Sequence, residues 1–206
     1  GPTPFPDSAP VSIPQPLRTT LELLVLMHHV RGAAQYVEWG SGASTSLVAP
    51  LARRALSLEN GVARCAELRA RADVRFWEAN GGLKLVCVDT GERGGERARD
   101  ERSRGAGGRP DPSPLVPSGP TGAFGTPAAG ADPATFARYS GALAAELGPR
   151  GAADAVLVDG RFRVACALAA LRHVRPGGVL MVHDWDRGAY HAPVLEFYDV
   201  VEVAER

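Results

Sequence analysis

The sequence predicts an α/β protein with a doubly wound, mostly parallel sheet, and three observations carry this prediction. Short apolar segments alternate with segments that have helical periodicity, which is the order of elements in parallel sheets. The apolar segments 155–158 and 179–182 are continuous, as is typical of strands covered by helices on both faces. A glycine-containing turn at 40–42 follows the first apolar segment, where a chain turns from a strand into a helix.

The predicted elements alternate along most of the chain. Pro50 should kink or delay the short helix expected after the first glycines. Helices are predicted at 17–32, after 42, and at 62–72, 132–147 and 163–174, and strands at 35–39, 54–59, 83–89, 154–159, 177–183 and 197–203.

The domain organisation follows from composition. Residues 1–16 contain six prolines and are expected to form an extended arm. Residues 17–206 are predicted to form a single domain with a flexible insertion at about 91–131, because that stretch is rich in charged residues, glycine and proline. Gly1-Pro2 resembles the residues that a protease leaves behind after cleavage. A native targeting segment would then have been removed, so the sequence does not indicate a cellular compartment.

Charge and cysteine usage exclude several classes of function. Lys plus Arg and Asp plus Glu both number 23, which argues against a nucleic-acid or anionic-membrane partner. No apolar run approaches the roughly 20 residues of a membrane span. Cys65, Cys87 and Cys166 are far apart and form no C-x-x-C pair, so we expect buried thiols rather than a metal-thiolate site or disulfides.

The residues that follow the strands are the candidates for a ligand site, because parallel α/β sheets bind ligands at the carboxyl ends of their strands. Gly40 and Gly42 allow a tight turn that brings backbone N–H groups close to a ligand. Glu38 beside this turn would repel a pyrophosphate and suits a ligand with an ammonium or sulfonium group. Glu59 ends the next strand 19 residues after Gly40, where a carboxylate can bind both ribose hydroxyls; the alternative is a solvated charge.

Four segments carry a resemblance to a known family. They are E-W-G-S-G-A-S-T at 38–45, S-L-E-N at 57–60, V-L-V-D-G-R at 156–161 and R-P-G-G-V-L-M-V-H-D-W at 175–185. The chain resembles class I S-adenosylmethionine-dependent methyltransferases, and within them small-molecule and sugar O-methyltransferases with V-D-G and H-D strand ends. The resemblance spans 17–206 apart from the insertion, and it implies a Rossmann-like methyltransferase fold.

The resemblance also implies how the cofactor contacts are distributed. Asp159 would lie under the sulfonium, near the methyl group to be transferred, and Glu59 would bind the ribose. Asn60 and Asp89 would border the adenine. The methionine part of S-adenosylmethionine would be held by Glu38, Gly40, Ser41 and Gly42.

The candidate catalytic residues are Asp159, His183 and Asp184. Methyl transfer requires positioning and, for a hydroxyl acceptor, removal of a proton. His183 has the intrinsic pKa of a general base, and the alternative is a histidine packed in the sheet. Asp159 and Asp184 end neighbouring strands and are candidate ligands of a magnesium ion, although Trp185 stands where related enzymes have an asparagine ligand.

The predicted function is methyl transfer from S-adenosylmethionine to an oxygen of a small molecule or sugar, without a nucleic-acid partner. Two alternatives remain: a non-catalytic binding or scaffold domain, and a nicotinamide-dependent oxidoreductase, against which Glu38 and the missing third glycine argue. The family's antiparallel seventh strand has no candidate before Arg206. Either the given sequence is truncated, or a sheet edge is left exposed that the proline-rich arm or a partner must cover. The oligomeric state is open.

Overall fold

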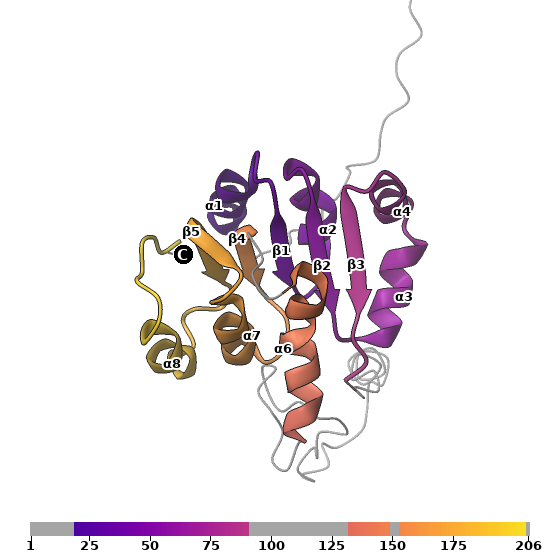
Figure 1. Ribbon diagram of the computed structural model, residues 1–206. Coiled ribbons are helices and arrows are strands. Elements are labelled where there is room, and N and C mark those ends of the chain that lie inside the picture. Colours follow the sequence, from indigo (N-terminus) through magenta and orange to yellow (C-terminus); the bar gives the residue numbers. More distant parts are fainter. Residues whose placement is uncertain (1–18, 91–131, 149–152, 205–206) are drawn as a thin grey trace, which may run out of the picture.

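The computed structural model describes residues 19–90, 132–148 and 153–204, so the predictions for the proline-rich arm and for the insertion lie outside the described residues. The described chain contains a five-stranded parallel sheet in the order β3-β2-β1-β4-β5 (Figure 1). This arrangement confirms the predicted fold class. The strands are β1 (Tyr36–Trp39), β2 (Ala55–Glu59), β3 (Leu83–Cys87), β4 (Ala153–Val158) and β5 (Val174–Val182).

Helices cover both faces of the sheet. On one face, Tyr36 belongs to an apolar cluster with α1 (Thr20–Val30), α2 (Ala43–Leu47), α3 (Val62–Ala70) and α4 (Ala72–Ala79). On the other face, Val37 and Trp39 pack with α6 (Pro133–Leu147) and α7 (Arg163–Ala170). Successive side chains of a strand point to opposite faces, so β1 contributes to both clusters and is buried along its whole length.

The boundaries of α1 and α6 follow from local sequence signals. Thr19 and Glu22 form a reciprocal capping box at the start of α1. Asp132 caps α6, with its carboxylate accepting from the N–H of Ala134, and Pro133 occupies the first turn. Gly148 follows α6 with a φ of 76°.

Two predicted helices differ from those observed. The helix expected over 62–72 stops at Ala70, and α4 follows after Arg71, which adopts an extended conformation between the two helices. The helix expected over 163–174 ends at Ala170, because β5 begins at Val174. The first pair of β5 joins Val174 to Ala153, and a register shift then precedes the pair of Val179 and Ala155.

The predicted strand at 197–203 is wrong. The short segments η3 (Gly188–Tyr190) and α8 (His191–Leu195) follow β5, and residues 198–204 then run past the sheet without regular structure. Val201 in this stretch is 81% exposed, so its side chain gains little from burial there. Among the described residues, β5 is therefore one of the two edge strands of the sheet, and β3 is the other. None of the helices in these residues combines the length and the apolar composition that a membrane span requires.

The expectation that the cysteines are unpaired is also wrong. Cys65 and Cys87 form a disulfide with a Cα–Cα distance of 6.0 Å, whereas Cys166 is free and buried. Cys65 lies on α3 and Cys87 ends β3, so the packing of this helix on the sheet brings together two residues that are 22 positions apart. The spacing of the cysteines in the sequence does not predict how this helix packs on the sheet.

The turns that follow β1 and β4 touch each other through glycine. A Cβ at Gly40, whose φ is 95°, would lie 2.6 Å from the backbone nitrogen of Gly160. A Cβ at Gly160 would collide with the hydroxyl of Tyr139 and would lie 2.9 Å from the backbone nitrogen of Gly40. Glycine at both positions therefore lets the two strand ends approach each other.

We expect Gly160→Ala to lower the free energy of unfolding by about 1–3 kcal/mol, because the added methyl group overpacks a tight contact. Gly141→Ala is the matched control, since nothing lies within 4 Å of its Cβ position and it is inside α6. The free energy of unfolding of this control should be about 0.5–1 kcal/mol higher than that of the wild type, because alanine is favoured over glycine inside a helix. Urea unfolding of both variants measures the difference, and equal stabilities would contradict the close approach of the turns.

Candidate active site at the carboxyl ends of the strands

The structure brings the candidate residues to one edge of the sheet. Because the strands are parallel, their carboxyl ends lie side by side in the order β3, β2, β1, β4 and β5. Asp89, which is exposed, follows β3 by two residues, and Asn60 is buried directly after β2. Glu59 ends β2, the glycine turn follows β1, Asp159 follows β4, and His183 with Asp184 follows β5.

A buried carboxylate holds the glycine turn. Glu38 is fully buried, and it accepts hydrogen bonds from the hydroxyls of Tyr36 at 3.0 Å, of Ser57 at 2.6 Å, and of Thr45. Burial raises the pKa of Glu38, and the hydrogen bonds from Ser57 and Thr45 oppose that rise. The donors come from β1, β2 and α2, so one carboxylate ties these three elements together.

The turn itself is joined to this carboxylate on both sides. Thr45 accepts from the backbone N–H of Gly42 at 2.9 Å. The hydroxyl of Ser41 lies 2.5 Å from that of Ser57, and the N–H of Ser41 donates to Glu59 at 3.1 Å. The conformation of the turn is thus fixed by side chains of β1, α2 and β2, which sequence spacing could not show.

Glu59 is held in place at the end of β2. Its carboxylate accepts from the N–H groups of Ser41 at 3.1 Å and of Gly61 at 2.7 Å. Burial raises the pKa of Glu59, and these backbone hydrogen bonds oppose the rise. A carboxylate has about four lone-pair sites, more than the backbone N–H groups of Ser41, Gly61 and Asn60 occupy together.

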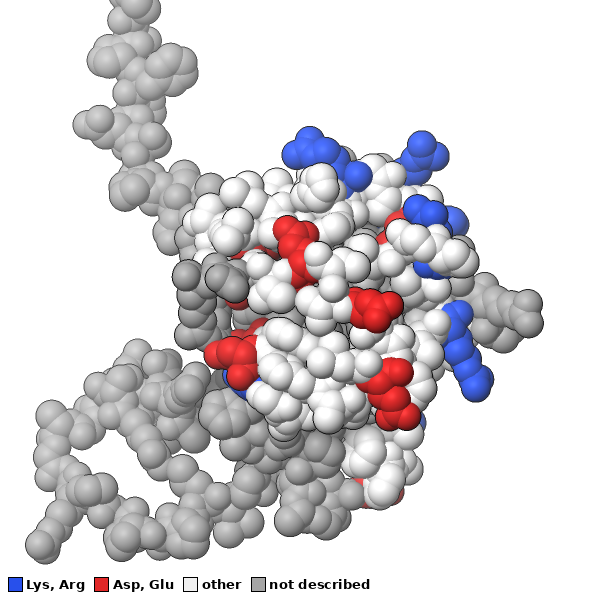
Figure 2. Space-filling view, turned by 90° about the vertical axis from the view of Figure 1, so that its left-hand side faces the viewer, with Lys and Arg blue, Asp and Glu red and all other residues white. Residues whose placement is uncertain are grey.

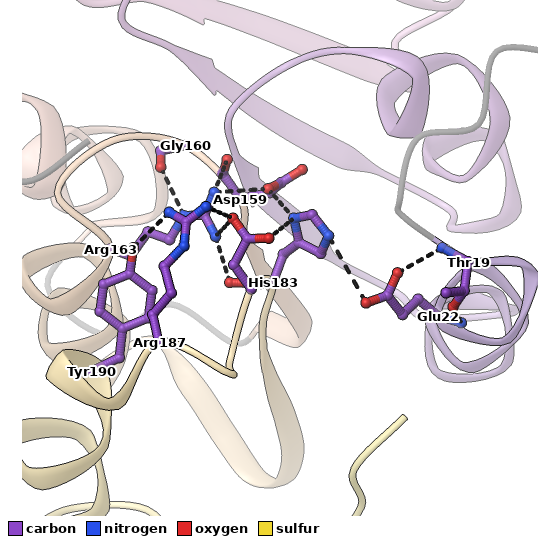
Figure 3. Close-up of polar contacts among 9 residues, drawn as sticks. Thr19, Glu22, Asp159, Gly160, Arg163, His183, Arg187 and Tyr190 are labelled. Carbon is purple, nitrogen blue, oxygen red and sulfur yellow. Dashed lines mark hydrogen bonds and ion pairs between the residues drawn. The ribbon is translucent and has the colours of Figure 1, made fainter. Parts of the chain in front are cut away.

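Asp159 and His183 form a hydrogen-bonded pair across β4 and β5. The Nδ1 atom of His183 lies 2.6 Å from Oδ1 of Asp159. Burial disfavours the protonated imidazole, but the hydrogen bond and negative charge of Asp159 outweigh this effect, so the pKa of His183 is raised. Figure 3 shows the imidazole between Asp159 on one side and Glu22 of α1 on the other.

Arg163 fastens the ends of β4 and β5 to each other. Its guanidinium donates to the carboxylates of Asp159 at 3.2 Å and Asp184 at 2.9 Å, and also to backbone carbonyls that include Gly160 at 3.1 Å. The side chain of Arg163 is only 9% exposed. Arg187 adds a second ion pair with Asp184 at 2.6 Å, and Figure 3 shows both arginines beside Tyr190.

Two non-glycine residues with left-handed backbones lie next to Arg163. Phe162 has a φ of 52° and Asp184 a φ of 56°. This region is unfavourable for a bulky side chain such as Phe, and such strain persists only where surrounding contacts hold it. The ion pairs of Asp184 and the burial of Phe162 provide those contacts.

The sequence placed Arg163 among the residues after the fourth strand without a role, and it gave no sign of Glu22. Arg163 lies four residues after Asp159, at the start of α7, and this helical spacing was a usable signal. Glu22 belongs to α1, far from the strand ends in sequence. Its Oε2 accepts from the N–H of Thr19 at 2.8 Å, and its Oε1 lies 4.0 Å from Nε2 of His183.

The surroundings of Asp159 and Asp184 do not fit a magnesium ion. Within residues 19–90, 132–148 and 153–204, no group of three or more His, Cys, Asp or Glu side chains could hold a metal. The guanidinium of Arg163 lies between the two carboxylates and supplies the positive charge there. No step that uses a metal follows from this geometry.

Comparison with known proteins identifies a structural relative. No protein-family model and no curated protein matches the sequence. A methyltransferase-like protein from Silicibacter pomeroyi, known from its crystal structure, is similar at 28% sequence identity and a TM-score of 0.57, over 86% of this chain and 77% of that one. This likeness supports a methyltransferase fold, and it supports methyl transfer in general as the type of reaction.

The raised pKa of His183 predicts a pH-dependent contribution to stability. Because the folded-state pKa lies above the unfolded value of about 6.5, the contribution is complete below that value and is lost as the pH rises through the folded-state pKa. The stability difference between the wild type and His183→Asn should therefore be larger at pH 6 than at pH 9. Urea unfolding of both proteins at both pH values measures this difference. The contributions of the other histidines to the pH dependence cancel, because both proteins contain them. A difference that does not change with pH would contradict the Asp159–His183 pair.

Proposed function

We propose that the protein transfers a methyl group from S-adenosylmethionine to an oxygen of a small molecule or a sugar. The observation that carries the proposal is the order of groups along one edge of the sheet: the carboxylate of Glu59, the glycine turn, and the Asp159–His183 pair. In this order the edge offers a carboxylate that can accept hydrogen bonds from ribose hydroxyls, a turn whose backbone can bind a ligand, and a base. The methyltransferase-like relative supports the reaction type.

The described residues fit a nucleoside cofactor with a sulfonium group. Glu59 retains lone pairs for ribose hydroxyls, and Asn60 and Asp89 would border the adenine. Gly40, Ser41 and Gly42, backed by Glu38, would hold the methionine part. Asp159 would lie near the positive sulfonium, since a Cβ at Gly40 would be 2.8 Å from the carbonyl carbon of Asp159. S-adenosylmethionine would supply an activated methyl carbon, whose bond to sulfur breaks with the electron pair left on sulfur.

The Asp159–His183 pair would remove the proton of the acceptor. Asp159 fixes the ring through Nδ1, so Nε2 faces away from Asp159. This Nε2 is buried and has no hydrogen-bond partner among the described residues. As the O–H bond of the acceptor breaks, the proton passes to Nε2 and the oxygen keeps the electron pair that forms its bond to the methyl carbon. Asp184 would act indirectly, by holding Arg163.

We expect S-adenosylhomocysteine to bind and Glu59→Gln to weaken its binding. Loss of charge-assisted hydrogen bonds to the ribose should cost about 1.5–3 kcal/mol, or roughly ten- to a hundredfold in affinity. Glu67→Gln is the matched control, because Glu67 lies exposed on α3 and pairs only with Arg64 among the contacts that the structure gives it. Calorimetry measures both variants. Unchanged affinity in Glu59→Gln would remove Glu59 from the ribose site, and binding of NAD instead would favour an oxidoreductase.

We expect His183→Asn to lower turnover by about 10²–10⁴-fold, which is the usual contribution of a general base. S-adenosylhomocysteine should still bind, because the glycine turn and Glu59 are unchanged. The control is His28→Asn, at an exposed position of α1. Release of S-adenosylhomocysteine with a panel of sugars and phenols measures the rate. A variant as active as the wild type would exclude His183 as the base, and cofactor binding without turnover of any acceptor would favour a scaffold domain.

A further inference from the structure

A disulfide lies beside the half of the site that would bind the ribose and the adenine. Cys65 of α3 is buried, whereas Cys87, the last residue of β3, is only partly buried. Their Cα atoms are 6.0 Å apart, and Figure 1 shows α3 alongside β3. The bond therefore ties the helix that follows Glu59 to the strand that pairs with Glu59.

Both cysteines are connected to Glu59 by short backbone contacts. Cys87 is the register partner of Glu59, and the N–H of Val88 donates to the carbonyl of Glu59 at 2.8 Å. On α3, the N–H of Cys65 donates to the carbonyl of Gly61 at 2.8 Å, and the N–H of Gly61 donates in turn to Oε1 of Glu59 at 2.7 Å. The candidate ribose-binding carboxylate is thus held from both ends of the cross-link.

The first turn of α3 also brings a positive charge to the site. Arg64 directly precedes Cys65, and a Cβ at Gly42 would lie 3.7 Å from a guanidinium nitrogen of Arg64. Burial raises the pKa of Glu59, and the charge of Arg64 opposes that rise. A displacement of this helical turn would therefore move Arg64 relative to the glycine turn and to Glu59 at the same time.

Reduction of the bond forces the two sulfur atoms apart. Bonded sulfur atoms are about 2.05 Å from each other, whereas non-bonded heavy atoms need roughly 3.5–4 Å. Cys65 is 2% exposed and belongs to the apolar cluster on this face of the sheet, so its side chain has little room to turn away. Farther along α3, Leu68 is buried and Arg69 donates to the carbonyl of Leu85 at 3.3 Å. The displacement therefore falls on the first turn of the helix.

We propose that the Cys65–Cys87 disulfide is a redox switch of the cofactor site. In the oxidised protein the cross-link holds the first turn of α3 and the carboxylate of Glu59 in place for the ribose, and reduction weakens cofactor binding. The effect on binding rests on the proposed function, whereas the movement of α3 requires no cofactor.

The reductant of this switch is a dithiol. One of its thiolates attacks Sγ of Cys87, which is the more exposed of the two cysteines, and Sγ of Cys65 leaves with the electron pair of the S–S bond and takes up a proton. The second thiol of the reductant then breaks the mixed disulfide, so Cys87 is released as a thiol. The protein gains two electrons and two protons, and the reductant becomes a disulfide.

The switch acts on one half of the site. Strands β2 and β1 lie between β3 and β4, so the Asp159–His183 pair is remote from the disulfide along the sheet. Figure 2 views the molecule from the β5 side, where acidic side chains gather, and the β3 end of the sheet lies on the side away from the viewer. Reduction should therefore change cofactor binding and leave the Asp159–His183 pair in place.

Thiol counting and calorimetry test the switch. After air oxidation the unfolded protein should show one thiol group, that of Cys166, and after treatment with dithiothreitol it should show three. S-adenosylhomocysteine should bind the reduced protein roughly three- to tenfold more weakly than the oxidised one, because the hydrogen bonds from the ribose to Glu59 are weakened but not removed. Three thiols after oxidation, or equal affinities in the two states, would overturn the proposal.

Single substitutions assign the effect to this bond. In Cys87→Ala the cross-link cannot form, so the affinity for S-adenosylhomocysteine should be the same with and without dithiothreitol. Cys65→Ala should behave in the same way, and it is the second variant if Cys87→Ala does not fold. Cys166→Ala is the matched control, because it keeps the bond and should keep the difference in affinity. A redox-dependent affinity that persists without the bond, or that is lost in Cys166→Ala, would overturn the proposal.

Hydrogen exchange without cofactor separates this proposal from the proposed function. On reduction, the amide protons of Gly61 and Cys65 should exchange at least about fivefold faster, whereas those of β4 should keep their rates. This change in a protein that does not bind S-adenosylhomocysteine would contradict the proposed cofactor and support the redox-dependent movement of α3. Unchanged exchange at Gly61 and Cys65 would overturn the switch even where S-adenosylhomocysteine binds.

Discussion

The buried carboxylate of Glu38 is the interaction on which the geometry of the candidate site depends. An isolated carboxylate without exposed surface would be costly, so its oxygens must be hydrogen-bonded. The donors that satisfy it, Tyr36, Ser57 and Thr45, come from two strands and a helix. The requirement to satisfy one polar group thereby fixes where the glycine turn begins, where α2 starts and how β2 lies beside both.

Arg163 plays a comparable part at the other half of the edge. Its buried guanidinium is compensated by Asp159 and Asp184, and it thereby holds the ends of β4 and β5 at a fixed separation. The two polar clusters meet where Gly40 approaches Gly160. One cluster positions the turn that would hold the cofactor, and the other positions His183, so the glycine contact sets the distance between the two halves of the site.

The sequence predicts the fold well because the apolar periodicity of strands and helices is local information. The parallel sheet and the start of α6 at Asp132-Pro133 follow from such signals. The strand expected at 197–203 did not form, because its valines offer β propensity but have no described partner strand. The disulfide between Cys65 and Cys87 was missed because it depends on how α3 packs against β3.

The candidate site was predictable only in part, for the same reason. Residues at strand ends could be placed at one edge, since parallel strands impose that arrangement. The partners of Glu38, the role of Arg163 and the approach of Glu22 to His183 arise from tertiary packing across distant segments. Sequence patterns predict which residues lie at the site, whereas tertiary packing determines which of these residues contact one another.

A crystal structure with S-adenosylhomocysteine tests the central claim most directly, because it places every group of the cofactor at once. We expect the ribose hydroxyls on the carboxylate of Glu59, the amino-acid part along Gly40 to Gly42, and the sulfur atom toward Asp159 and His183. A cofactor bound away from the glycine turn, or a glycine turn that stays empty at saturating ligand, would contradict it.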